Sequence, residues 1–563
     1  RAVFSHAGFS TKDLSGSMDG KPVKLDVRVG QSYTQNKANH VEAAIRGVFS
    51  TEYLLSFDPS LKDLKNTLQG PSPWVFTVSS PAAKNQAAAP VYLRAQSELV
   101  GTRINLPEPL QKPAASMQAL NMLTQLPVDK GTIEFKLGDQ FRLLLKKPVS
   151  KPMSGIALFG SLTQGAIPAS GFSVRGQTER FDVASWLALA SKADDGAGLQ
   201  AFDLTVNRLK LVGQEFGKTR LLMSPAANGM NMRAQGANLD GQVNIPDAEN
   251  APISADFKTV HTLPGDRVGP APSVLPSAAA IDFGNPSELP PIMLSIQDLR
   301  IGDIGFGRCE LQTAPSQQGM LIQKFSTQSP LMTINASGLW QGTGLQARTS
   351  LQATLASKDL GRMLTAFHYQ DVIKSGDTKA QFTGAWAGSP MDFSLQGFNG
   401  NLSLDVLNGQ ILGVEPGGGR VLGLVSLAEI PRRLTLDFSD FLGEGFGFNH
   451  IKGQFAFAQG KANTQNLKIL APAADITITG STDLVKQQFN QQVEVRAKTS
   501  GLLPVLGAVT LGPVGVAVGV VAQAVLDKPL KDNATVHYEI TGSWAKPDVR
   551  KVQTPGSSGK KKQ

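Results

Sequence analysis

Hydrophobic and polar residues alternate along much of this chain. A period of two places successive side chains on opposite faces of a strand, so each such segment has one apolar face and one polar face. The clearest examples are NLSLDV (401–406), RLTLDF (433–438), GQFAFA (453–458), DITITG (475–480) and VHYEIT (536–541). The pattern predicts a mainly β protein: a long, curved, antiparallel β-sheet groove, a repeating β-gutter with a few short helices.

An internal repeat supports a repeating sheet. The segment that begins LTVNRLKL at Leu204 aligns without gaps with the one that begins LSIQDLRI at Leu294, an offset of 90 residues. Gly-x-Trp also recurs, at Trp340, Trp386 and Trp544. An aromatic binding site is one interpretation of these tryptophans, and a packed marker of strand ends is the other.

Helical spacing occurs in two short stretches, SWLALASKA (185–193) and KDLGRMLTAFHY (358–369). Nine prolines between residues 246 and 292 predict a linker. We therefore expect six parts: a β-groove segment (1–160), a β repeat unit with a short helix (161–250), a Pro-rich linker (251–292), a second repeat unit with a short helix (293–390), a C-terminal β region (391–550) that includes an apolar helical segment (502–526), and a disordered basic tail (551–563).

Composition excludes several classes of site. The lone cysteine, Cys309, rules out an intramolecular disulfide and a cysteine-based zinc site, and the six histidines show no metal-ligand spacing. No nucleophile elbow is present, and the glycines at 417–419 lack the Lys-Ser/Thr pair of a phosphate loop. The net charge of +9 is unaccompanied by a nucleic-acid motif. We expect no enzyme activity, no metal, no cofactor and no nucleic-acid partner.

The stretch from 501 to 531 carries no charge before Asp527, and this uncharged part contains five glycines and two prolines, Pro504 and Pro513. Its length would allow a membrane span, yet Pro513 interrupts any helix. Three interpretations stay open: a span, two short helical segments that plug the sheet, or segments that touch a membrane reversibly. The residues of the membrane-contact interpretation are Leu502, Leu503, Val505, Leu506, Val516, Val518 and Val520.

The C-terminal third carries a more specific pattern. GRVLGL (419–424), PRRLTLDF (431–438) and the closing GSWAKP (542–547) resemble the signature of AsmA-like proteins, and in particular of their long YhdP-type branch. Weaker similarity extends over nearly the whole chain. Members of this branch are usually longer and begin with an inner-membrane helix. The chain begins at Arg1 rather than Met, so we expect a C-terminal half without that anchor.

This resemblance implies a bridge-like lipid carrier of the Gram-negative envelope. Its expected function is phospholipid transport between the inner and outer membranes through a hydrophobic β-groove, which supports outer-membrane lipid homeostasis. The protein would lie in the periplasm, anchored to the inner membrane and reaching toward the outer membrane. Its partners would be phospholipids, both membranes and possible envelope proteins, and we expect a monomer.

The residues point to the same use, because an apolar sheet face must be covered and acyl chains are one natural cover. The expected groove face comprises Leu402, Leu404, Leu434, Leu436, Phe438, Phe455, Phe457, Ile476 and Ile478. Arg432 and Arg433 are candidates for lipid headgroup contacts, or else solvated edge charges that block aggregation. Two other functions stay open: a TamB-like factor for envelope protein assembly or export, and a structural β-solenoid.

Overall fold

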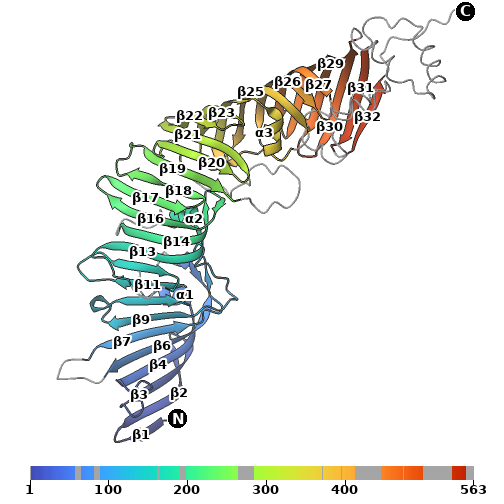
Figure 1. The fold of residues 1–563 in the computed structure, drawn as a ribbon. Helices are drawn as coiled ribbons and strands as arrows, with labels where there is room; N and C mark the ends of the chain where they lie inside the picture. The colour runs from blue at the N-terminus through green and yellow to red at the C-terminus, as the bar shows by residue number, and fades with distance from the viewer. Residues whose placement is uncertain are drawn as a thin grey trace, which may run out of the picture. The chain divides into compact units, whose positions relative to one another are not determined.

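A computed structural model describes residues 2–57, 65–81, 89–161, 165–190, 198–263, 284–369, 372–394, 396–412, 446–472, 474–498, 535–544 and 546–552. These residues form two units, one made of residues 1–249 and 256–265, the other of residues 250–255 and 266–563. Each unit is a long sheet whose neighbouring strands follow one another in the chain (Figure 1). The predicted class, mainly β with a long antiparallel sheet and few helices, is confirmed.

The described residues of unit 1 contain most of the sheet strands that precede residue 263, together with short helical segments. The helices are α1 (Thr51–Leu55), α2 (Val183–Ala190) and the 3-10 turn η2 (Val128–Lys130). The strands are β1 (Ala2–Ser5), β2 (Gly8–Met18), β3 (Lys21–Val29), β4 (Asn39–Ser50), β5 (Leu68–Gln69), β6 (Pro71–Pro81), β7 (Val91–Ser97), β8 (Arg103–Ile104), β9 (Leu120–Leu126), β10 (Ile133–Leu137), β11 (Phe141–Lys146), β12 (Ser154–Phe159), β13 (Gly171–Asp182), β14 (Leu199–Leu211), β15 (Gln214–Phe216), β16 (Thr219–Ala226), β17 (Gly229–Gly236), β18 (Leu239–Pro246) and most of β19 (Ile253–Thr262).

Unit 2 is a regular antiparallel meander. Its helices are α3 (Leu360–Ala366) and the 3-10 turns η3 (Gly344–Gln346) and η4 (Pro390–Asp392). Its strands are β20 (Ile292–Ile301), β21 (Ile304–Ser316), β22 (Gly319–Gln328), β23 (Thr333–Gln341), β24 (Arg348–Ser357), β25 (Ile373–Ala387), β26 (Asn399–Ile411), β27 (Phe446–Ala458), β28 (Lys461–Leu470), β29 (Ala474–Asp483), β30 (Gln488–Ala497), β31 (Thr535–Ser543) and β32 (Lys546–Val552).

Two strand pairs of unit 1 depart from the predicted antiparallel order. β12 pairs with β13, and β13 with β14, in parallel. A parallel pair cannot be closed by a hairpin, so the chain returns past the length of one strand before each of them; each return is here called a crossing. The first crossing covers Ile156 and Leu158, since a Cβ at Gly165 would lie 2.7 Å from the Ile156 side chain. The second crossing includes α2, which packs on the face of the sheet opposite to Ile156 and Leu158.

The internal repeat forms equivalent hairpins in the two units. β14 to β17 correspond to β20 to β22, and the turn glycines Gly229 and Gly319 have φ angles of +143° and +141°. A side chain at either glycine would overlap the carbonyl oxygen of the facing strand, so both positions require glycine.

Both predicted helices are present, as α2 and α3. Asp182 accepts hydrogen bonds from the backbone of Ala184 and Ser185 before α2, and Asp359 caps α3 by accepting one from Arg362 N at 3.0 Å. Strand β19 lies inside the stretch whose prolines predict a linker. Its sequence, ISADFKTVHT, contains no proline, and the backbone there keeps its donors for pairing.

A glycine recess in unit 2 is filled by an aromatic ring. Gly384 of β25 faces Gly400 of β26, and a Cβ at either position would overlap the ring of Phe398. Phe398 is 1% exposed and stacks on Phe382 with ring centroids 4.6 Å apart. It also meets Phe457 of β27 edge-on at 5.6 Å. The ring of Phe398 therefore packs directly on the backbone of the two glycines, in the space that side chains would otherwise occupy.

Candidate functional site

Six of the nine residues predicted to form the groove face lie in the described part of unit 2, and all six lie on one face of the sheet. Leu402 and Leu404 of β26 lie opposite Phe455 and Gly453 of β27. The remaining residues of the set are Phe457 on β27 and Ile476 and Ile478 on β29. All six belong to one hydrophobic cluster. The sheet therefore gathers residues that alternation alone assigned strand by strand.

The register extends this face across the unit as one continuous line, here called the apolar row. It contains one residue from every strand from β20 to β31, each lying against the next. Its members are Ile296, Cys309, Thr327, Ile334, Leu355, Ala380, Leu404, Gly453, Leu467, Ile478, Val493 and Tyr538. Strands lie about 4.8 Å apart, so the row is a closely spaced track perpendicular to the strands, apolar at every position except Thr327. Helix α3 packs on this face through Leu360 and Met363.

The single cysteine of the chain lies in the apolar row. Cys309 is 2% exposed. Burial, and to a smaller extent the neighbouring Glu310 carboxylate, raise the pKa of the Cys309 thiol to about 11. The thiolate is the reactive form, and it is scarce at neutral pH when the pKa is raised.

We expect maleimide labelling of native Cys309 at pH 8 to be at least about a hundredfold slower than labelling of the unfolded chain, because the two thiol pKa values differ by about two units. The native rate should rise as the pH approaches 11. The measurement is labelling followed by mass spectrometry, with and without guanidinium chloride. Equal rates in the two conditions would place the thiol outside a buried face.

Unit 1 carries a comparable line, here called the open strip. Its members are Leu25, Ile45, Phe76, Ala95, Met122, Phe135, Leu143, Ala157, Val174, Phe202, Met223, Met232 and Val243. All of them except Ala95 are partly exposed. The open strip therefore leaves an apolar surface accessible along the sheet. Sequence reasoning selected no site residue before 402, although KLDVRV and IEFKL alternate as clearly as the C-terminal strands.

One side of the apolar face of unit 1 is closed, and we call it the closed rim. The segment from 98 to 118 contributes Leu99, Ile104 and Leu110 to the cluster that buries Leu204, and α1 and α2 pack on the same cluster. Trp186 of α2 stacks on Phe181 and donates a hydrogen bond to the carbonyl oxygen of Glu108 at 2.8 Å.

Lys112 holds the irregular segment of the closed rim together. Its Nζ donates to the carbonyl oxygens of Leu99, Thr102 and Pro113 at 2.7, 2.7 and 2.9 Å. The side chain is buried, and this burial lowers the pKa of Lys112. A buried ammonium requires such acceptors, so the lysine serves as an internal clamp for a segment whose regular backbone pairing is limited to β8 and a bridge between Ile104 and Lys112.

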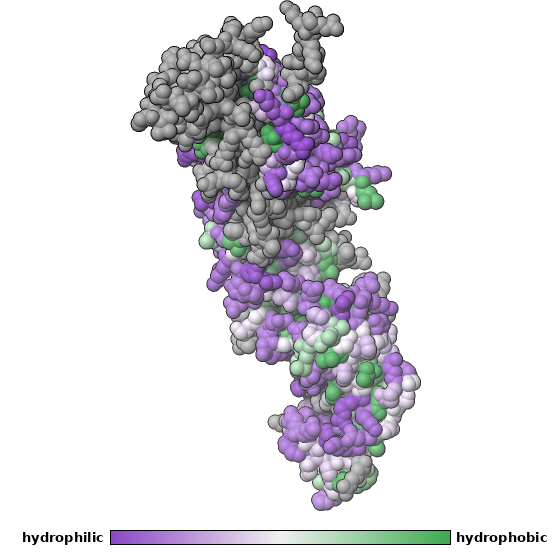
Figure 2. All heavy atoms as spheres, turned by 90° about the vertical axis from the view of Figure 1, so that its right-hand side faces the viewer, coloured by the Kyte–Doolittle hydropathy of each residue, from purple (hydrophilic) through white to green (hydrophobic). Residues whose placement is uncertain are grey.

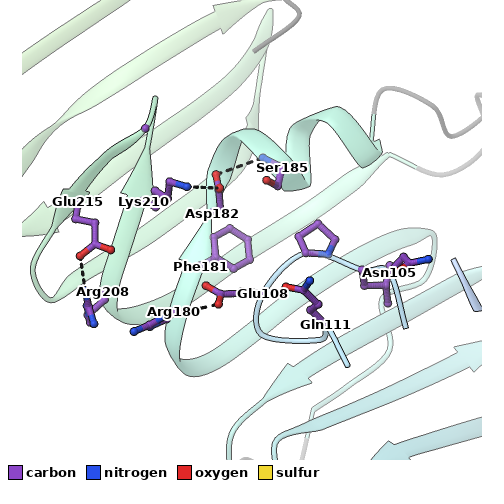
Figure 3. A pocket seen from close by; sticks show the side chains of 13 residues that line it. Asn105, Glu108, Gln111, Arg180, Phe181, Asp182, Ser185, Arg208, Lys210 and Glu215 are labelled. Carbon is purple, nitrogen blue, oxygen red and sulfur yellow. Dashed lines mark hydrogen bonds and ion pairs between the residues drawn. The ribbon is translucent and has the colours of Figure 1, made fainter. Parts of the chain in front are cut away.

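A polar pocket of about 700 Å³ opens at the closed rim, between α2, the ends of β13 and β14, and residues 105–111 (Figure 3). Its charges are arranged in ion pairs: Arg208 with Glu215 at 2.6 Å, Lys210 with Asp182 at 3.4 Å, and Arg180 with Glu108 at 3.7 Å. Equal numbers of positive and negative groups leave the pocket without net charge.

The other face of each sheet is mostly polar, apart from the covered residues Ile156 and Leu158 of unit 1, and carries cross-strand ion pairs. Arg220 binds Asp203 through two hydrogen bonds of 2.7 Å, and Lys324 pairs with Glu310 at 2.5 Å. Asp26 is 1% exposed and pairs with Arg46 at 2.8 Å. Hydrophilic residues predominate on the side shown in Figure 2, with hydrophobic residues in smaller patches. Charge and apolar surface are therefore separated by the sheet.

The other predicted site residues lie outside the described residues: Leu434, Leu436 and Phe438 of the groove face, Arg432 and Arg433, and the segment 502–526 with Leu502, Leu503, Val505, Leu506, Val516, Val518 and Val520. Over the described part of the chain, none of the helices has both the length and the apolar character needed to cross a membrane. Within the same residues, His, Cys, Asp and Glu side chains form no cluster of three or more that could hold a metal ion.

Comparison of the sequence with known proteins identifies the family of this chain. The model of the YhdP protein family matches residues 3–549. The intermembrane phospholipid transporter YhdP of Escherichia coli (strain K12) is 24% identical over 487 residues, which cover 83% of this chain and 37% of that protein. The chain thus spans little more than a third of its relative's length. No solved structure matches the chain. Because the family model covers nearly all of the sequence, the chain belongs to the YhdP family.

Proposed function

We propose that this chain carries phospholipids along the apolar face of its sheets, as a non-enzymatic part of transport between the inner and outer membranes. The observation that carries the proposal is the open strip, a strand-by-strand line of partly exposed apolar side chains. Each methylene that leaves water for such a surface gains about 0.8 kcal/mol. Acyl chains of a phospholipid fit this surface chemically, and the E. coli relative bears the name of a phospholipid transporter.

A transport track requires continuity from strand to strand. The open strip and the apolar row each pass from strand to strand without a charged residue among their members. Chemistry on the lipid is unnecessary for this role. We place the protein in the periplasm, where it would act as a monomer between the two membranes, support outer-membrane lipid homeostasis and meet envelope proteins at either end.

The first test is the content of the purified protein. The chain, expressed in a Gram-negative host and purified without detergent, should contain bound phospholipid that organic extraction and mass spectrometry detect at about one or more molecules per chain. Fluorescent phospholipid should also pass from donor to acceptor vesicles faster when the chain is present. Absence of lipid together with a stably bound client protein would instead support a role in envelope protein assembly. Absence of both would support a structural sheet.

A further inference from the structure

The two sides of the open strip differ, and the difference limits where a lipid headgroup can lie. This inference rests on the proposed function. On one side, the segment 98–118, α1 and α2 cover the sheet at the closed rim. On the other side, the strands end in connections such as 127–132 and 147–153, next to partly exposed residues. A lipid whose tails lie on the open strip therefore has its solvent-facing exit at this second edge.

That edge is rich in lysine between β9 and β12. The β9–β10 connection contains Lys130, and Lys146 ends β11 just before Lys147 and Lys151 of the β11–β12 connection. β9 to β12 are neighbours in the sheet, so both connections leave it at the same edge. All four lysines are exposed, and we call them the lysine rim. Asp129 is the sole acidic residue of residues 127–132 and 146–153.

The lysine rim differs from the pocket at the closed rim in whether its charged side chains form ion pairs. Within the described residues, Lys130, Lys146 and Lys151 form no ion pair, whereas the charges that line the pocket are paired with one another. Neighbouring like charges repel, and an anion between them relieves that repulsion. A lysine ammonium is a common ligand of phosphate oxygens.

The spacing of residues along β11 shows that the lysine rim lies close to the open strip. Leu143 belongs to the open strip, Leu145 faces the same side one row closer to the edge, and Lys147 follows two residues later. At about 3.3 Å per residue, Lys147 lies about 13 Å from Leu143, within the reach of one phospholipid. Val149 stands between the lysines with 88% of its surface exposed, and Val128 and Met153 nearby are 39% and 40% exposed. The edge thus mixes cationic and apolar contacts, as lipid interfaces require.

We propose that the lysine rim binds the phosphate groups of phospholipids whose acyl chains lie on the open strip, so that lipids enter unit 1 with their headgroups toward residues 127–132 and 146–153 rather than toward α2.

The chain offers a matched control for this proposal. The test variant is Lys130→Gln, Lys147→Gln and Lys151→Gln together, because Lys147 follows Leu143 and Leu145 on the side of the open strip, whereas Lys146 alternates to the other face. The control variant is Lys379→Gln, Lys452→Gln and Lys468→Gln, three exposed lysines on the polar face of unit 2, which removes the same charge. Each protein is loaded from vesicles that contain either phosphatidylglycerol or phosphate-free diacylglycerol, and bound lipid is counted by mass spectrometry.

We expect the test variant to load at least about fivefold less phosphatidylglycerol than the wild type, since each lysine near anionic lipid contributes roughly a fivefold factor. Diacylglycerol loading should stay unchanged, and the control variant should load both lipids normally. Added salt should narrow the difference. Equal loss of both lipids, equal loss in the control variant, or wild-type loading by the test variant would each overturn the proposal while the proposed function stands. A wild-type chain that loads neither lipid would overturn the proposed function itself.

Two further arms test the source of the phosphate and the direction of the headgroup. Millimolar glycerol 3-phosphate should leave loading unchanged, and displacement by it would show a site for free phosphate instead. In a Cys309→Ala background, a fluorophore at Ser150→Cys should be quenched by lipid spin-labelled at the headgroup more strongly than one at Ser185→Cys, since Ser185 lies in the first turn of α2 at the closed rim. The reverse order of quenching would refute the orientation.

Discussion

Met232→Asp should reduce phospholipid transfer by at least about tenfold and leave the sheet folded. Met232 lies in the open strip on β17 and is partly exposed, so the protein can tolerate a polar group there while the strip is empty. A lipid that passes this point would have to bury the carboxylate among acyl chains, which costs several kcal/mol, and each 1.4 kcal/mol is a factor of ten. Transfer of fluorescent phospholipid between vesicles measures the effect, and circular dichroism checks the fold.

The neighbouring residue supplies the control. Asn231 is exposed on the opposite face of the same strand, so Asn231→Asp should transfer lipid at the wild-type rate. Met232→Leu should also be active, because it keeps an apolar side chain of similar volume. If Met232→Asp and Asn231→Asp both transferred lipid normally, the open strip could not be the path.

Phe398→Ala should lower the free energy of unfolding by about 3 to 5 kcal/mol, the usual cost of truncating a fully buried phenylalanine. The ring fills the recess above Gly384 and Gly400, and neither glycine can supply replacement contacts. Guanidinium denaturation followed by tryptophan fluorescence reports the change, because Trp386 packs on Phe393, which packs on Phe398. Met391→Ala, at a side chain 41% exposed, is the control and should change stability little. A loss below about 1 kcal/mol for Phe398→Ala would show that the recess collapses around the gap.

Within the described residues, alternation was enough to predict strands such as β26, β27 and β29 and their apolar faces, but the rows across strands could not be derived from it. The strand predicted at 433–438 lies outside the described residues. A shift of one residue in register moves every side chain to the other face. The register here contains bulges, for instance between Lys452 and Phe455 and between Thr464 and Leu467, and nothing in a single strand's sequence reveals them. The apolar row therefore became visible only when the pairing was known.

The closed rim was missed for a different reason. Leu99, Ile104 and Leu110 are buried in a segment with little regular structure, so no periodicity marks them. The lysine clamp that holds the segment depends on backbone carbonyl oxygens, which any sequence supplies. The two parallel pairings were likewise hidden, because alternation within one strand does not reveal the direction of the strand beside it. The roles of the predicted groove residues, including Leu402 and Ile478, stay predictions.

The two chain crossings in unit 1 also have a consequence for assembly. Elsewhere in the described sheets, nearly every strand pairs with the strand just before it in the chain, so pairing can spread by short loop closures. β13 and β14 each lie parallel to the strand before them, so each can pair only after the chain has returned past the length of one strand. Closing these two longer connections costs more conformational entropy than closing a hairpin, so we expect them to be the slow steps of an otherwise local folding process. During synthesis, β1 to β12 can therefore pair with one another first. β14 and the strands after it can join the sheet only later, once α2 has packed on it.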